Sequence, residues 1–425
     1  MGFQQGISGL NAASKNLDVI GNNIANSGTV GFKASRAEFA DLVASSMAGF
    51  SGGKSAGFGV ETATISQQFS QGGLNMTGNG LDVAINGGGF FKLQLPDGSS
   101  AYTRAGNFKQ DKTGDVVTND GAHVMGYKVD PTTGIATSST VPLSFPVGSP
   151  IAAQPTTSAT ITFNLDARAK DAAGAAAVVG PPAVPAIPAT PRSTYGTSVN
   201  VYDSQGVATP VNLYFEKDAV ANTWKVFDKL DDATATPPVV ATSIGTVKFD
   251  TNGKYDPANA AITLTVKPTT NPNAPPVADI AIKLDLSGAT QFGSKFAISD
   301  LQQDGFAAGE LKGINIGADG TIMASYSNGV TRAEAQIALT NFRNPQGLTA
   351  VGSNNWVESG DSGVPVDGKP GSGSFGTLRA GALEESNVDL TAELVGMMTA
   401  QRSYQANAQT IKTQDQVMST LVNLR

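Results

Sequence analysis

Few side chains in this 425-residue sequence have the types and spacing that catalysis or metal binding requires. The only histidine, His123, could act as a general base, but residues 119–122 before it are typical of a turn. Residues 250–254 begin like a calcium loop, yet a lysine stands at a ligand position and no glutamate closes the loop. Residues 78–80 could open a dinucleotide fingerprint, but Val83 stands where the third glycine belongs. We interpret all three segments as turns or ordinary surface.

The composition excludes several further classes of chemistry. Cysteine is absent, so disulfides, zinc–cysteine sites and thiol nucleophiles are excluded, and one histidine cannot build a multi-histidine metal site. The net charge of −7 gives no electrostatic attraction to nucleic acid. No apolar run reaches the length of a membrane span, and the first ten residues lack the regions of a secretory signal. We therefore expect no enzyme, no cofactor, no metal site, no nucleic-acid partner and no membrane insertion.

The two ends of the chain favour helices. All 22 prolines lie between Pro96 and Pro370, which leaves both ends free of helix breakers. Apolar residues recur there at heptad spacing, in the N-terminal set Ile7, Leu10, Leu17 and Ile24 and the C-terminal set Leu390, Leu394, Met397, Tyr404, Ile411 and Met418.

The expected helix boundaries follow from local composition. The first helix should end near 26–28, with Ser8 and Asn11 as early caps, and the second should begin with a capping box from Ser386 to Asp389. Two interpretations of the apolar stripes stay open. Each helix could pack on its own domain, or the two could pair with each other or with neighbouring subunits.

Between the ends the apolar residues alternate with polar ones, which predicts antiparallel β structure. Alternation in 81–85 and 91–95 on either side of Gly87–Gly89 indicates a hairpin. A second hairpin is expected around the turn at Asp319–Gly320, and a further turn at Asn328–Gly329.

Residues 148–300 differ from their surroundings and have the character of an inserted domain. Strands are expected around the four segments Val199–Tyr202, Val211–Phe215, Trp224–Phe227 and Ile280–Leu286. Residues 171–192 are rich in alanine and proline and predict an exposed, extended loop, and a second proline-rich stretch spans 268–276. The glycine-rich segment 49–59 is interpreted as a flexible joint.

Several long motifs, in the right order, resemble the flagellar rod and hook protein family. Asn22–Lys33 (NNIANSGTVGFK) resembles the N-terminal signature of that family, and Met397–Arg425 resembles its C-terminal helix in the hook version. Further resemblances lie in Gly381–Leu390, Val83–Phe91, Tyr102–Lys109 and Asn344–Leu348. The signature residues carried over are Asn22, Asn23, Asn26, Gly31, Phe32, Lys33, Gln401, Arg402 and Asn407.

The resemblance implies a mainly β protein with long terminal α-helices. The terminal helices, 1–30 and 388–425, would form an inner coiled-coil-like layer, with the two apolar sets above as the polymerisation residues. A connecting segment would comprise 31–75 and 360–387. Antiparallel β domains would stack outward, an inner one from 76–147 and 301–359 and one inserted in it from 148–300.

The resemblance also implies a function. Hook members of the family are extracellular structural subunits that self-assemble into a curved hollow tube, a universal joint that transmits motor torque to the filament. The implied partners are further copies of the chain in a helical homopolymer, the flagellar rod, hook cap and hook–filament junction proteins, and the flagellar export apparatus. Two alternatives stay open: another axial component such as a distal rod protein, which should lack so large an insertion, and a secreted β-rich adhesin, which would need a concave binding site.

Overall fold

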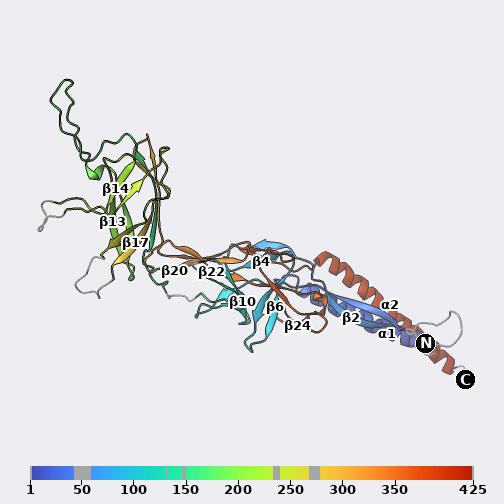
Figure 1. Cartoon of the computed structure of the whole chain (residues 1–425). Coiled ribbons are helices and arrows are strands. Elements are labelled where there is room, and N and C mark those ends of the chain that lie inside the picture. The colour runs from blue at the N-terminus through green and yellow to red at the C-terminus, as the bar shows by residue number, and fades with distance from the viewer. Residues whose placement is uncertain are drawn as a thin grey trace, which may run out of the picture. The chain divides into compact units, whose positions relative to one another are not determined.

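The computed structural model describes residues 2–42, 59–130, 133–145, 150–232, 240–267 and 278–423. The chain forms two compact units (Figure 1). Unit 1 comprises Met1–Val147, Lys312–Ser325 and Thr331–Arg425, and unit 2 comprises Gly148–Leu311 and Tyr326–Val330. The four-part division expected from the sequence stays a prediction. The second proline-rich stretch, 268–276, lies outside the described residues, and so does the glycine-rich segment 49–59 except for Gly59.

The N-terminal helix α1 spans Gly2–Ala25 and ends where the sequence predicts. The Asn26 backbone N–H donates to the Asn22 carbonyl at 3.1 Å, and Thr29 N–H donates to the Asn26 carbonyl at 3.0 Å, which turns the chain out of the helix. The expected caps were wrong, because Ser8 and Asn11 lie inside the helix. The Ser8 hydroxyl instead donates to the Gln5 carbonyl at 3.0 Å.

The C-terminal helix α2 spans Leu390–Asn423, 34 residues or roughly 51 Å at about 1.5 Å per residue. The predicted capping box was wrong, because Asp389 itself is the N-cap. Its Oδ1 accepts hydrogen bonds from the N–H groups of Thr391 at 2.9 Å and Ala392 at 3.1 Å. The Ser386 hydroxyl lies a turn too early and accepts only from Val388 N–H, at 3.3 Å.

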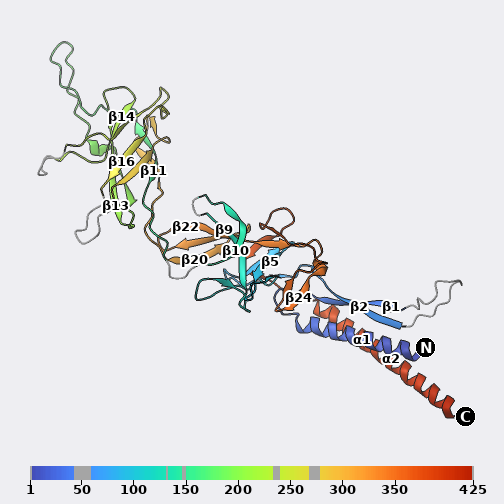
Figure 2. The ribbon, with the colours of Figure 1, turned by 60° about the horizontal axis from the view of Figure 1, so that its bottom comes forward.

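The two terminal helices run antiparallel and pack together (Figures 1 and 2). Their contact is made by small residues. A methyl group placed on Gly6 would come within 2.9 Å of Ile411 Cγ1, and one on Gly9 would come within 2.9 Å of the Asn407 side-chain amide. At the other end of the pair, Gly396 faces the Ile20 side chain. Glycine therefore lets these two helix backbones approach closely.

A two-stranded hairpin lies beside α1 in unit 1. It consists of β1 (Ser35–Leu42) and β2 (Gly59–Gln67), which pair antiparallel with a bulge between Glu38 and Phe39. Two further short pairs link distant parts of the chain: β3 (Leu74–Met76) with β28 (Ala382–Glu384), and β4 (Val83–Asn86) with β27 (Thr377–Ala380). Both pairs bring the segment before α2 back to the first quarter of the chain.

In the part of unit 1 that the structure describes, the main sheet has thirteen strands. Its central path runs β20 (Leu311–Ile316), β21 (Thr321–Tyr326), β22 (Thr331–Ile337), β9 (His123–Val129), β5 (Phe90–Gln94), β6 (Ser100–Thr103), β25 (Asn355–Val357) and β24 (Thr349–Gly352). The strands off this path are β7 (Lys109–Gln110), β8 (Val116–Val117), β10 (Ala136–Pro142), β23 (Leu339–Asn341) and β26 (Val366–Gly368), and a 3₁₀ turn, η2, spans Pro345–Gly347. Aromatic side chains fill one core of this unit with edge-to-face contacts: Phe69, Phe90, Tyr102, Phe342 and Trp356.

One predicted hairpin is confirmed and the other is wrong. β20 and β21 are neighbours around the Asp319–Gly320 turn, and β21 pairs with β22 around Asn328–Gly329. In contrast, β4 does not pair with β5 across Gly87–Gly89 but with the distant β27. Val83, Ala84 and Ile85 are all fully buried, so both faces of β4 are covered and the strand lacks the half-exposed pattern of a local hairpin.

Unit 2 is a β-sandwich built on one apolar core. One sheet contains β11 (Ser158–Asp166), β16 (Ile262–Val266), β17 (Ile280–Asp285), β18 (Thr290–Phe292) and β19 (Ala297–Gln303). The other contains β12 (Gly196–Tyr202), β13 (Ala208–Lys217), β14 (Thr223–Phe227) and β15 (Gly245–Lys248), and η1 (Arg192–Thr194) precedes it. The four strands expected here are confirmed. The parallel pairing of β11 with β17 and β18 was not predicted.

Asp304 ties the first strand of this sandwich to the end of its last. Its carboxylate accepts hydrogen bonds from the backbone N–H groups of Thr157 at 2.8 Å and Ser158 at 3.0 Å, and from both hydroxyls. Burial alone would raise the pKa of Asp304, but these hydrogen bonds prevail and lower it. The stability that Asp304 contributes is therefore present above the unfolded pKa of about 3.9 and is lost as pH falls through the lower folded value.

This gives a pH prediction. Asp304→Asn should lower the urea midpoint of unit 2 at pH 7, because the amide cannot accept four such hydrogen bonds as a carboxylate does. Between about pH 5 and pH 3, roughly one unit on either side of the unfolded pKa, the urea midpoint should fall less steeply in the variant than in the wild type. Tryptophan fluorescence at each pH measures both. Equal slopes for the two proteins would contradict the assignment.

Candidate functional site

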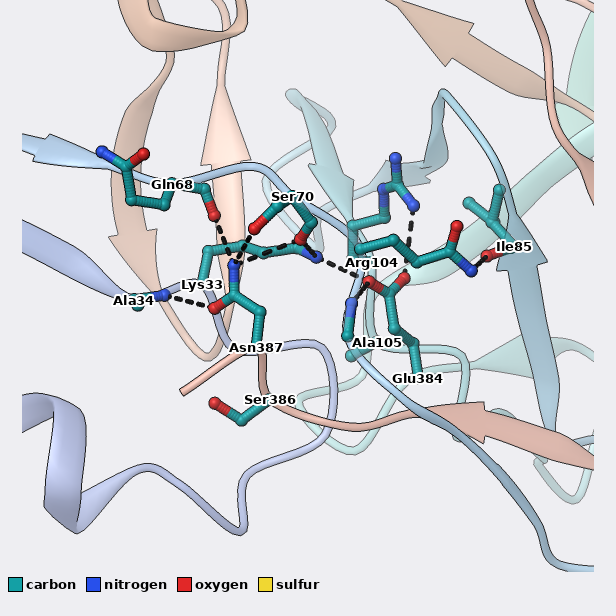
Figure 3. A network of polar contacts seen from close by, with 12 residues as sticks. Lys33, Ala34, Gln68, Ser70, Ile85, Arg104, Ala105, Glu384, Ser386 and Asn387 are labelled. Atoms are coloured by element: carbon teal, nitrogen blue, oxygen red, sulfur yellow. Dashed lines mark hydrogen bonds and ion pairs between the residues drawn. The ribbon is translucent and has the colours of Figure 1, made fainter. Parts of the chain in front are cut away.

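The carboxylate of Glu384 lies at the centre of a buried polar network that joins the two ends of the chain (Figure 3). The Lys33 Nζ donates to Glu384 Oε1 at 2.6 Å, and both side chains are fully buried. Lys33 follows α1, and Glu384 precedes α2. Loss of either partner of such a buried charge pair strongly destabilises the protein, because the other charge is left uncompensated.

Two further groups complete the contacts of this carboxylate. Arg104 Nη1 donates to Glu384 Oε2 at 3.2 Å, and the backbone N–H of Gly72 donates to Oε1 at 3.0 Å. The Arg104 guanidinium also lies 5.2 Å from the ring centroid of Phe90, a cation–π distance. One carboxylate is thus shared by two cations that come from separate parts of unit 1.

The pKa values of the two cations reflect their burial. Desolvation lowers the pKa of Lys33 below its usual range, and the attraction of Glu384 opposes this. Desolvation likewise lowers the pKa of Arg104, again against the attraction of Glu384. Glu384 therefore opposes the effect of burial on the pKa of both cations.

Asn387 extends the network toward α2 (Figure 3). Its Oδ1 accepts from the Ala34 N–H at 2.7 Å, and its Nδ2 donates to the carbonyls of Gln68 at 2.7 Å and Ser70 at 3.1 Å. The Lys33 ammonium donates to the same Ser70 carbonyl at 2.8 Å. We call Lys33, Arg104, Glu384 and Asn387 the Glu384 network.

Asn23 makes a second link between the ends. It is almost fully buried near the end of α1, where its amide exchanges two hydrogen bonds with the Ser35 backbone at 2.8 and 2.9 Å. Its Nδ2 also donates to the Glu393 carboxylate, in the first turn of α2, at 2.9 Å. Asn23 thereby fixes α1 to both β1 and α2.

Position 31 requires glycine, because of both its backbone conformation and the atoms around it. Its φ of +71° lies in the left-handed region, and a methyl group there would come within 2.5 Å of the Ala105 backbone nitrogen. Its N–H donates to the backbone carbonyl of Glu384 at 2.8 Å. The turn between α1 and Lys33 therefore rests directly on the strand that carries Glu384.

The structure thus brings some of the signature residues together and not others. Asn23, Gly31 and Lys33 join the ends, and Asn26 donates to Asn22 Oδ1 at 2.7 Å as the helix closes. Phe32 is half-buried between these groups, and Asn407 lies against Gly9 in the helix pair. Gln401 and Arg402 are exposed on α2.

The predicted polymerisation residues fall into a half-buried group and an exposed group. The half-buried members are Leu10, Leu17, Ile24, Met397 and Ile411. The exposed members are Ile7, Leu390, Leu394, Tyr404 and Met418. Within one chain the helices pair through the small residues described above, so the exposed members of the two stripes are left uncovered.

Glu384, Arg104 and Asn387 were not singled out from the sequence. Glu384 and Asn387 stand inside the family-like segment 381–390, but no spacing pairs a lysine at 33 with a glutamate 351 positions later. The sequence offers only a weak indication of this pair: one motif ends in a lysine, and the other contains two adjacent glutamates.

The segments considered for catalysis or metal binding lie in strands, turns and the loops beside them. His123 begins β9 and is half-buried, and Asp250 accepts hydrogen bonds from the Asn252 and Lys254 N–H groups of its own turn, both at 2.8 Å. Within the described ranges, three or more potential metal-ligating side chains of His, Cys, Asp or Glu nowhere come together. None of the described helices is both long and apolar enough to cross a membrane.

Four family models match the chain in order. They are "Flagella basal body rod protein" over 3–33, "Flagellar hook protein FlgE/F/G D1 domain" over 84–164, "Flagellar basal body protein FlaE D2 domain" over 164–306 and "Flagellar basal body rod FlgEFG protein C-terminal" over 379–424. These models, together with the joined terminal helices, define a protein of the flagellar rod and hook class.

Full-length relatives narrow the class. The chain is 41% identical to the flagellar hook protein FlgE of Salmonella typhimurium and 40% identical to that of Escherichia coli, with the whole of both chains covered in each case. It is also similar in fold to the crystal structure of Helicobacter pylori flagellar hook protein FlgE2, with a TM-score of 0.54, 18% identity, and coverage of 73% of this chain and all of that one. The chain belongs to the flagellar hook protein FlgE family.

A substitution tests the importance of the Glu384 network. Glu384→Gln should lower the stability of unit 1 by about 3–5 kcal/mol, because the buried Lys33 and Arg104 charges lose their carboxylate. Urea unfolding followed by circular dichroism measures the loss.

A matched control is Glu38→Gln, which breaks the exposed ion pair with Arg36 by the same chemical change. Its midpoint should move little, since exposed pairs are screened by water. Similar losses for the two variants would show that the buried network has no special weight.

Proposed function

We propose that this chain, a structural subunit of the flagellar hook, assembles through its terminal helices into a curved hollow tube. The observation that carries the proposal is the uncovered apolar surface of α1 and α2. Leu394 is 46% exposed and Met418 is 58% exposed, although both are large apolar residues on a helix. Leu390, Leu394 and Met398 are exposed on successive turns of α2, and neighbouring exposed apolar side chains of this kind are typical of a protein interface.

A groove beside the helix pair supports assembly between copies. It has a volume of about 650 Å³ and is lined mainly by small residues of both helices and flanked by the hairpin: Gly9, Ala12, Ala13, Asn16, Phe39, Val60, Ala392, Val395, Gly396, Thr399, Ala400, Ser403 and Asn407. The same helices expose large apolar side chains that suit such a groove. Each copy thus offers both the protruding and the receiving surface, as a homopolymer needs.

Within the described residues, the far end of α2 extends past the helix that it packs on. Because Gly6 faces Ile411, and α1 begins only four residues before Gly6, α2 continues beyond α1 (Figure 2). Val417 and Met418 lie on this continuation and are exposed. Gln401 and Arg402 are also exposed although they belong to the signature. We infer that these side chains contact neighbouring subunits in the tube.

The mechanism follows from two kinds of contact. Inner helices packed through apolar surface resist twisting, whereas outer β domains must slide past one another as the tube bends at each turn. Small, polar interfaces permit such sliding better than large apolar ones. Alternating exposed residues on the strands of unit 2, as in β16 and β17, supply a surface of this kind. The tube thereby acts as a universal joint that transmits torque from the motor to the filament.

The finer assignments belong to the same proposal. The hook subunit lies outside the cell and meets the rod, the hook cap and the hook–filament junction proteins after passage through the flagellar export apparatus. It has no catalytic role. A distal rod protein is disfavoured because hook proteins match over their full length, and a β-rich adhesin is disfavoured for the same reason.

Electron microscopy tests the proposal directly. Purified protein, concentrated at neutral pH, should form curved tubes in negative stain, because the apolar helix faces are then covered by neighbours. Protein that stays monomeric at every concentration and salt tried, while folded by circular dichroism, would contradict it.

A charged substitution tests which surface drives assembly. Leu394→Asp should abolish tubes or raise the critical concentration at least tenfold, because the interface would bury an unpaired charge. The control, Gln409→Asp, adds the same charge at an exposed polar position of the same helix and should leave assembly within about twofold, as expected of a surface change. Sedimentation of the polymer measures both. Equal effects of the two substitutions would exclude a specific role for the apolar face.

A further inference from the structure

Unit 2 carries an arm, residues 172–190, that extends away from its strands (Figure 1, green). Its two sides are paired by backbone hydrogen bonds. Ala175 and Ile187 exchange N–H donations at 2.8 Å, and Val178 and Val184 do so at 2.9 and 3.1 Å. The arm is thus a long bridged hairpin, where the sequence predicted an exposed extended loop.

The base of the arm is fixed to the sandwich. Ala172 N–H donates to the Lys217 carbonyl at 3.2 Å, and the Lys217 ammonium donates to the carbonyls of Ala167 at 3.1 Å and Ala169 at 2.7 Å. Just beyond the arm, Arg192 forms an ion pair with Glu216 at 2.9 Å. These contacts hold the hairpin at a defined place on unit 2.

The surface of the arm is apolar and uncovered. Val179 is 98% exposed and Val178 is 58% exposed, and Val184 and Ile187 are exposed as well. No charged residue occurs from Ala172 to Pro191. Exposed apolar hairpins without charge invite association, and soluble proteins normally carry charges or cover such surfaces.

We propose that the arm is an interaction element that packs on unit 2 of a neighbouring copy of this chain in the assembled polymer. Lack of charge removes repulsion between identical copies, and a homopolymer supplies a second copy at a fixed distance. Unit 2 also exposes separate large apolar side chains that can receive the arm, among them Val207, Val220, Val240 and Phe292. This inference rests on the proposed assembly into tubes, in which the arm makes one small apolar contact beside the polar strand surfaces that slide.

The absence of cysteine from the sequence makes a clean test possible. Val179→Cys places a single thiol at the most exposed position of the arm, where no buried contact is lost. Its reaction rate with a maleimide should fall at least tenfold from monomer to tube. Thr251→Cys, in an exposed turn of the same unit, is the control for access of the reagent to the tube. For each variant, the labelling rate in the tube is divided by the rate in the monomer. The proposal would be overturned if this ratio were no lower at position 179 than at position 251.

A crosslink identifies what covers the arm. Benzophenone maleimide attached to Val179→Cys is irradiated in tubes assembled from equal amounts of ¹⁴N and ¹⁵N subunits. Mixed-isotope peptides that join the arm to residues 150–311 are expected. Crosslinks confined to one isotope, or directed only to the terminal helices, would overturn the assignment.

The two proposals can fail separately. Replacing Val178, Val179 and Val184 by serine should leave tube formation intact, because the helices drive it, but lower the temperature at which tubes dissociate. Absence of tubes from the wild-type chain would overturn both proposals. Only the role of the arm would be overturned if tubes form, the thiol of the Val179→Cys variant labels freely in them, and the serine variant dissociates like the wild type.

Discussion

The buried carboxylate of Glu384 is the constraint on which unit 1 depends. Lys33 and Arg104 are both removed from water, and each is paired with this one carboxylate, whose attraction opposes the effect of burial on their pKa values. Because the three residues come from the start, the first quarter and the end of the chain, their contact closes the unit across its whole sequence. Such a contact cannot form until both ends are present, so it selects the complete fold over partial ones.

This closure explains how the terminal helices are presented. Gly31 turns the chain directly after α1, Asn387 precedes α2, and Asn23 bonds to Glu393 in the first turn of α2. The helices are thereby held side by side through small residues, and several of their large apolar side chains, such as Leu394 and Met418, are left exposed. The proposed assembly into a tube needs this division, with one helix face used within the subunit and another left for its neighbours.

Local features could be predicted from the sequence and distant pairings could not. Both terminal helices and four of the strands of unit 2 follow from periodicity, which depends only on nearby residues. The predicted hairpin across Gly87–Gly89 was wrong because β4 pairs with β27, nearly 300 positions later in the chain. The N-cap of α2 was assigned wrongly because only the structure shows that the first N–H groups of the helix donate to Asp389. The partner of Lys33 was hidden for the same reason, although the signature motif that contains Lys33 was recognised.

Hydrogen exchange at three amides tests most directly whether Glu384 and its neighbours close the unit. The N–H groups of Gly31, Ala34 and Gly72 donate to the Glu384 carbonyl, the Asn387 side chain and the Glu384 carboxylate, respectively. In the native monomer these amides should report one common free energy of opening, among the largest in unit 1, because they open only when the unit unfolds. Fast and unequal exchange, like that of fraying helix ends, would show that the ends separate independently and would contradict the account.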